Sequence, residues 1–373
     1  MREPGQITAT QTMMMITNSM VGVAILALPR IAVELVNSGA ILVTFIGLLL
    51  VFCSMVIIAK LGVRFPNESL IQSSKTIIGR PLAYLFGFFI FLFFILIVGF
   101  ITREFAFILS SFLFPDTPMT VLVGVMLIVV AITTRNDITT ISYIQFLYFP
   151  FIAIPILFLV LLSIPEIDMR LIRPFIGNQT NVFDFMKGSI MIAALPFAHI
   201  GMFVLTVLIP HTKNTKHAIR GSILGICISS LLLILIVFAV LGVFGINETK
   251  NPIWPVYVLT RMIQLPFELL ERLDILFLII WILSAFTTIL SGYLIVIYNG
   301  SQLFQLRSHR VLSYIMLPIV FMVALYPKNV IQLYDFIRTI GLYGLFITML
   351  YPILLLLVAL IRKKKGSTAN ETM

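Results

Sequence analysis

The side chains best suited to bind a small polar molecule lie inside the most apolar segments of this chain. Thr287, Thr288 and Ser291 stand close together in the stretch WILSAFTTILSGYLIV. On one helix their hydroxyls could contact a ligand or a cation, or could bond back to a carbonyl one turn earlier, and the sequence leaves both open. His199, in ALPFAHIG, is either a satisfied residue of a helix bundle or a polar group of a binding site.

The chain carries no constellation that is typical of an enzyme. It has no phosphate-binding loop, no cluster of His, Asp and Glu with metal-ligand spacing, and no paired carboxylates deep in an apolar segment. We therefore expect no enzymatic activity, no cofactor and no metal site. Binding, rather than catalysis, is the chemistry that these residues favour.

Ionisable residues inside apolar segments are further candidates for function. Arg30 and Glu34 are one helical turn apart, and we expect a local ion pair rather than a ligand clamp. Others lie near the predicted ends of segments, where long side chains can reach water, and we assign them no role in binding: Arg103, Glu104, Lys187, Asp335 and Arg338.

Two of the segments that must position these residues are interrupted by the same tripeptide, Ala-Leu-Pro, at residues 27–29 and 194–196. Proline removes a backbone donor, and a nearby glycine such as Gly22 lowers the cost of leaving helical geometry. Backbone groups freed in lipid must be paired, and they are tolerated where they line a cavity. Either break alone is more often a simple kink, but two in corresponding positions predict a central site for a small polar or zwitterionic ligand.

Composition identifies a polytopic membrane protein. Of 373 residues, 60% are hydrophobic and 11% charged, and the mean hydropathy is +1.11. Apolar runs of about 20 residues, long enough to cross a bilayer, recur from end to end. We expect a single transmembrane domain, 1–373, with ten spans: 10–36, 39–62, 82–113, 118–134, 139–163, 185–209, 218–244, 274–304, 311–326 and 330–361.

The interrupted segments are the first spans of two five-span halves, 10–163 and 185–361, followed by a basic and polar tail, 362–373. Five is odd, so the second half enters the membrane from the opposite side, which predicts an inverted repeat. The net charge of +10 falls in alternate loops. The positive-inside rule then places both termini in the cytoplasm and explains the basic charge without a nucleic-acid partner.

Three stretches, GVAILALPR, KLGVRFPNESLIQSSKTIIGRPL and LIRPFIGN, resemble the B subunits of bacterial spore germination receptors, and the GerK-type subgroup in particular. This family is a branch of the amino acid, polyamine and organocation transporter superfamily, and the resemblance runs along essentially the whole chain. It implies a LeuT-like all-α fold of ten helices in two inverted repeats, with a nutrient pocket between spans 1, 3, 6 and 8. It also implies residence in the spore inner membrane and a complex with an A subunit and a lipoprotein C subunit.

The function that follows is sensing of a nutrient germinant, an amino acid or a sugar. The alternatives are a secondary transporter of such nutrients and a channel subunit for ions or solutes. We expect Gly22→Leu to fill the first break and abolish the response. The predicted ligand-binding positions are Gly22, Val23, Ala24, Val98, Gly99, Ala194, Leu195, Pro196, His199, Thr287, Thr288 and Ser291.

Overall fold

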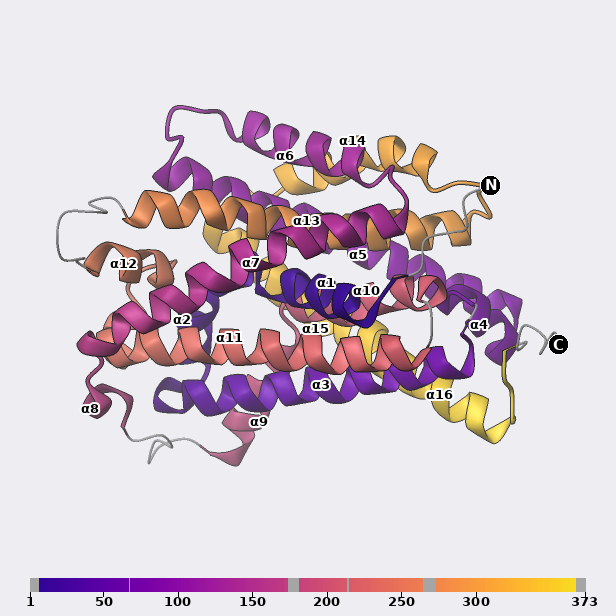
Figure 1. The fold of residues 1–373 in the computed structure, drawn as a ribbon, viewed down its shortest axis with the longest axis horizontal. Helices are drawn as coiled ribbons and strands as arrows, with labels where there is room; N and C mark the ends of the chain where they lie inside the picture. Colours follow the sequence, from indigo (N-terminus) through magenta and orange to yellow (C-terminus); the bar gives the residue numbers. More distant parts are fainter. Residues whose placement is uncertain (1–6, 67, 174–180, 213–214, 264–272, 367–373) are drawn as a thin grey trace.

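The computed structural model is a bundle of helices whose long members run along one axis (Figure 1). It describes residues 7–66, 68–173, 181–212, 215–263 and 273–366, and this part of the chain contains no β-strand beyond one bridge between Ile7 and Thr212. The α-helices are α1 Ala9–Val21, α2 Ala24–Val36, α3 Ala40–Arg64, α4 Leu70–Ile78, α5 Arg80–Phe112, α6 Met119–Thr133, α7 Ile138–Ser163, α8 Met169–Ile172, α9 Val182–Ala193, α10 Pro196–Leu208, α11 Thr215–Thr249, α12 Pro255–Met262, α13 Leu273–Leu303, α14 Arg310–Leu325, α15 Val330–Leu345 and α16 Tyr351–Ile361. Short 3-10 turns η1 Asn37–Gly39, η2 Ile164–Glu166 and η3 Ile209–His211 join some of them, and a π-helical turn, η4 Phe346–Leu350, joins α15 to α16.

The helices follow the ten predicted spans. Six helical stretches within the described ranges are long and apolar enough to cross a membrane, and the pair α9 and α10, bent by 54°, makes a seventh. Helices α6 and α14 are shorter, with 15 and 16 residues, and α1 with α2 forms the interrupted first span. The all-α polytopic fold is confirmed, whereas the bounds of the two halves stay predictions.

Large apolar side chains cover much of the outer surface of the bundle. Tyr143 and Ile154 of α7 and Met322 of α14 are more than 60% exposed. Such a surface would be a liability in water, but it is what a lipid environment requires of a spanning bundle.

The predicted basic loops gather at one end of the bundle. Helix α4 and the end of α16 lie at that end, and α8 and α12 lie at the other (Figure 1). Arg64, at the end of α3, donates to the carbonyl oxygens of Ala359 and Lys364, and Arg362 donates to that of Ile77. This arrangement agrees with the predicted sidedness; which end faces the cytoplasm stays a prediction.

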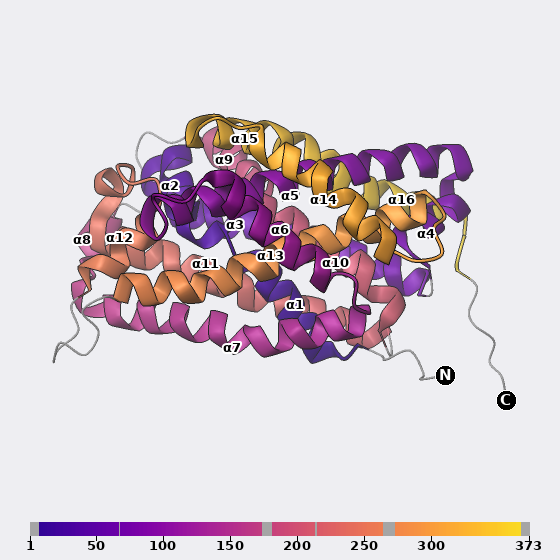
Figure 2. The same cartoon turned by 90° about the horizontal axis from the view of Figure 1, so that it is seen from above.

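Helix α1 lies in the middle of the bundle, alongside α7 (Figure 2) and tightly against α11. Two glycines one turn apart on α11, Gly221 and Gly225, allow the close approach. A Cβ at Gly225 would lie 2.9 Å from the carbonyl oxygen of Met13, closer than real Cβ contacts come. Small residues at such spacing are a common way for membrane helices to pack backbone to backbone.

We expect Gly225→Leu to push α11 away from α1 and to lower the free energy of unfolding by about 1 to 3 kcal/mol, the usual cost of overpacking. The measurement is thermal unfolding of the purified full chain in detergent. Gly124→Leu is the matched control, because a Cβ there meets only the ring of Phe321, at 3.7 Å. Equal stability of the two variants would contradict the role of Gly225.

Candidate functional site

The first break separates α1 from α2 at Gly22, and α13 supplies partners for the carbonyls that it frees. The Thr288 hydroxyl donates to the carbonyl oxygen of Asn18 at 3.0 Å, and the Trp281 indole donates to that of Gly22 at 3.2 Å. A Cβ at Gly22 would collide with the Thr288 hydroxyl. Glycine is therefore required here by the close approach of α13.

The second break separates α9 from α10, and His199 closes it. Its Nε2 atom lies 3.0 Å from the carbonyl oxygen of Ala194 and 3.1 Å from that of Gly341. Both partners are acceptors, so Nε2 carries the proton, and Nδ1 lies 2.8 Å from the Thr348 hydroxyl, which also lies 2.9 Å from the carbonyl oxygen of Gly344. Thr348 lies in the π-helical turn η4, so a local departure from α-helix places the partner of this imidazole.

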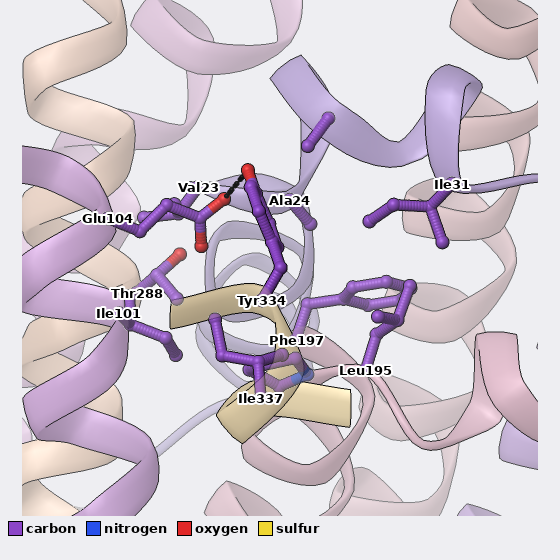
Figure 3. A pocket seen from close by; sticks show the side chains of 12 residues that line it. Val23, Ala24, Ile31, Ile101, Glu104, Leu195, Phe197, Thr288, Tyr334 and Ile337 are labelled. Atoms are coloured by element: carbon purple, nitrogen blue, oxygen red, sulfur yellow. Dashed lines mark hydrogen bonds between the residues drawn. The ribbon is translucent and has the colours of Figure 1, made fainter. Parts of the chain in front are cut away.

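A cavity lies where the two breaks meet, and Figure 3 shows its side chains. It holds about 400 Å³ of space between atoms, part of it open to the outside. Helices α2 and α10 both begin at its wall, and neither N-terminus has a side-chain cap, so both positive dipole ends face this region. The cavity is lined by Val23, Ala24, Ala27, Ile31, Ile101, Glu104, Leu195, Pro196, Phe197, Thr288, Tyr334 and Ile337.

Five of the predicted ligand-binding residues line this cavity: Val23, Ala24, Leu195, Pro196 and Thr288. Gly22 and Ala194 lie next to it, where their carbonyls are taken by Trp281 and His199. The structure thus brings both breaks and one of the three predicted hydroxyls to a single cavity.

Three other predicted residues do not reach the cavity. Val98 is fully buried and packs against Gly292 of α13. Gly99 faces Val323 of α14. His199 has partners at both ring nitrogens, all within the protein. Of the two interpretations that the sequence left open for it, the structure supports a satisfied bundle residue.

Thr287 and Ser291 are also outside the cavity, because a buried polar network between α1, α7 and α13 contains them. Each hydroxyl bonds back within α13, to the carbonyl oxygens of Ser284 and Thr287. The Gln145 side chain donates to the Thr287 carbonyl at 3.1 Å and to the Ser291 hydroxyl at 3.0 Å, and it accepts from Asn18 at 3.0 Å. These groups hold the first break in place rather than facing a ligand.

The expectation that Glu104 reaches water near a span end is wrong. Its side chain lies in the cavity wall and the residue is 6% exposed, because α5 continues to Phe112, more than two turns further. Arg103 is likewise buried and donates to the carbonyl oxygen of Pro327. By contrast Lys187, Asp335 and Arg338 are exposed as expected, and the ion pair of Arg30 with Glu34 is confirmed at 2.7 Å.

The contribution of the last predicted span to the cavity was not predicted from the sequence. Tyr334 and Ile337 of α15 line the cavity at helical spacing, as do Ile101 and Glu104 of α5. For Glu104 the sequence did hold a signal: the residue is ionisable, lies inside a long apolar run and is three positions from the apolar Ile101. For α15 the sequence held no comparable signal, because its position beside the breaks depends on the whole bundle.

Comparison with known proteins decides the family. Residues 6–333 match the family described as spore germination protein. This chain belongs to the spore germination protein family. Relatives include the Bacillus subtilis (strain 168) spore germination protein YndE, 25% identical over 96% of this chain and 98% of that protein. GerLB of Bacillus cereus is 23% identical over 96% of this chain and 94% of its own. The sequence identities to these relatives are too similar to assign the chain to one subgroup, so membership of the GerK-type subgroup stays a prediction.

The fold of this germination protein is that of LeuT-like transporters. It superposes on MhsT, solved in complex with L-phenylalanine, with a TM-score of 0.73 over 97% of this chain and 91% of MhsT, at 13% identity. The nucleobase-cation symporter Mhp1 gives 0.64 over 92% of this chain and 79% of its own, at 14% identity. The fold class expected from the sequence, with broken helices in the first and sixth spans, is confirmed.

We expect His199→Leu in this germination protein to leave two buried carbonyls without their donor, at a cost of about 1 to 3 kcal/mol for each unsatisfied group. The free energy of unfolding should therefore fall even with no nutrient present, as measured by thermal unfolding in detergent. Unchanged ligand-free stability together with a lost nutrient response would instead place His199 in the binding site.

Proposed function

We propose that this germination protein is the germinant-sensing subunit of a spore germination receptor and binds a small nutrient, an amino acid or a sugar, in the cavity between the two breaks. The cavity itself is the observation that supports this most strongly. It lies between helices of one bundle, which is one of the places where small-molecule sites occur. Ligand sites at the junction of interrupted helices are typical of this fold.

The position of the cavity suggests how binding acts. Its walls come from α2 and α5 of the first predicted half and from α10, α13 and α15 of the second. A ligand that contacts both halves stabilises one relative arrangement of them. Binding can signal only as far as the ligand has different affinities for two arrangements, so sensing needs no net transport.

The remaining parts of the proposal are supported by the resemblance to B subunits. They are residence in the spore inner membrane, with both termini on the cytoplasmic side, and assembly with an A subunit and a lipoprotein C subunit. The basic residues gathered at one end of the bundle are consistent with this orientation.

A working secondary transporter is the second candidate, favoured by the fold shared with MhsT and with a Na⁺-coupled sialic acid symporter. Reconstituted vesicles separate the two. We expect saturable binding of a labelled nutrient without concentrative uptake under an imposed ion gradient. Concentrative uptake would favour the transporter, and conductance without saturable binding would favour a channel subunit.

We expect Ala24→Leu to abolish nutrient binding, because Ala24 lines the cavity and three added carbons would occupy it. It is a better test than Gly22→Leu, since a side chain at Gly22 would displace α13 instead of filling space. The measurement is germination of spores that carry the variant, with binding to the purified chain alongside.

Gly124→Leu adds a side chain of the same kind on α6, away from the cavity, and should leave the response unchanged. Membrane abundance and ligand-free thermal stability of both variants show whether each folds. A normal nutrient response in a stable Ala24→Leu protein would refute the placement of the site.

A further inference from the structure

The most unusual group in the cavity is a carboxylate. Glu104 of α5 is one of twelve residues that line the cavity, and nine of the others are non-polar. One carboxylate oxygen accepts from the Tyr334 hydroxyl at 2.8 Å, and Figure 3 shows the two side chains pointing toward one another. The Tyr334 hydroxyl in turn accepts from the Trp254 indole at 3.2 Å. This chain of bonds holds the carboxylate at the cavity.

No cation of the described part of the chain pairs with Glu104. The neighbouring Arg103 donates to the carbonyl oxygen of Pro327 at 2.9 Å and lies over the ring of Phe107. Arg30 is engaged by Glu34 at 2.7 Å. A buried carboxylate without a cation is costly, and a charge kept inside a spanning bundle usually has a partner or a functional reason.

The polar side chains of the cavity can accept hydrogen bonds from a ligand, but their hydroxyl hydrogens are already donated to other groups of the protein. Thr288 donates its hydroxyl hydrogen to the carbonyl oxygen of Asn18, and Tyr334 donates its own to Glu104. What these side chains present to the cavity is therefore oxygen lone pairs, together with a negative charge when the Glu104 carboxyl is ionised. A ligand that fits them must bring hydrogens and a positive charge.

We propose that Glu104, with Tyr334 and Thr288, is a cation-accepting subsite and that the nutrient is a small amine with a compact apolar body. The inference rests on the proposed function and narrows it from amino acid or sugar to compounds with an ammonium group. The ammonium donates to the carboxylate, and the apolar body packs against residues such as Ile101, Phe197 and Ile337. A sugar would leave several hydroxyls unpaired against this largely apolar wall.

An inorganic cation fits the subsite less well. One carboxylate and two hydroxyl oxygens are few ligands for a hard metal ion. The described residues contain no group of three or more His, Cys, Asp or Glu side chains that could hold a metal. An ammonium, in contrast, matches a single carboxylate with flanking acceptors.

The test uses the purified full chain in lipid nanodiscs at pH 7, with dissociation constants taken from the shift of thermal unfolding with probe concentration. The probes are L-valine, L-leucine and L-phenylalanine, each with its amino alcohol, which keeps the ammonium, and its hydroxy acid, which lacks it. Glucose, NaCl and KCl are tested in the same way. We expect amino acids and amino alcohols to bind, and the hydroxy acids to bind at least about 30-fold more weakly.

Variants locate the effect. Glu104→Gln keeps the shape and removes the charge, and should weaken amine binding at least about 30-fold. Tyr334→Phe should weaken it about 2- to 10-fold, the value of one hydrogen bond. Asp274→Asn is the matched control: Asp274 also accepts from a tyrosine, Tyr257 at 3.1 Å, but it does not line the cavity. This variant should bind the amines as the unmodified chain does.

Several results would overturn the inference while leaving the receptor proposal standing. They are binding of a hydroxy acid or glucose as tightly as the amines, unchanged amine affinity in a folded Glu104→Gln protein, and stabilisation by Na⁺ or K⁺ alone that Glu104→Gln removes. Absence of stabilisation by every probe would instead refute nutrient binding, and both proposals would fall together. The comparison of amino alcohol with hydroxy acid needs no variant, so it decides the question even if Glu104→Gln does not fold.

Discussion

The need to pair backbone groups that two helix breaks release is the constraint on which the rest of the structure depends. Away from water, an unpaired carbonyl costs more than most side-chain contacts return. At the first break, Thr288 and Trp281 of α13 meet the freed carbonyls. At the second, His199 bridges Ala194 to Gly341. These bonds fix where α13 and α15 lie relative to the breaks, and hence where the cavity is.

The same pairing divides the polar residues of the bundle into two groups. Gln145, Thr287 and Ser291 bond to one another and to α1, and this network stands apart from the cavity. Glu104, Tyr334 and Thr288 are the polar side chains that remain in its lining. The polar side chains of the network are therefore separate from those that line the cavity. In the proposed function, the charge of one carboxylate in so apolar a wall has a large influence on which ligand is accepted.

The family and the fold together frame the function. The chain belongs to the spore germination proteins, and it has the fold of transporters whose interrupted helices surround their substrates. A cavity between two halves of a bundle can serve a transporter or a sensor, because both depend on a ligand that favours one arrangement of the halves. A transporter goes on to release the ligand on the far side of the membrane, whereas a sensor does not need this step.

The sequence by itself determined the membrane class, the order of the spans, the two breaks and the region where the cavity lies, because apolar length, proline and glycine act locally along one chain. It could also supply the family resemblance. It could not tell that Thr287 and Ser291 bond inward while Thr288 faces the cavity, since one helix presents different faces to different neighbours. Nor could it place Glu104 beside Tyr334, 230 positions away along the chain. Only the tertiary structure decided those contacts, because burial and hydrogen-bond partners depend on which helices pack together.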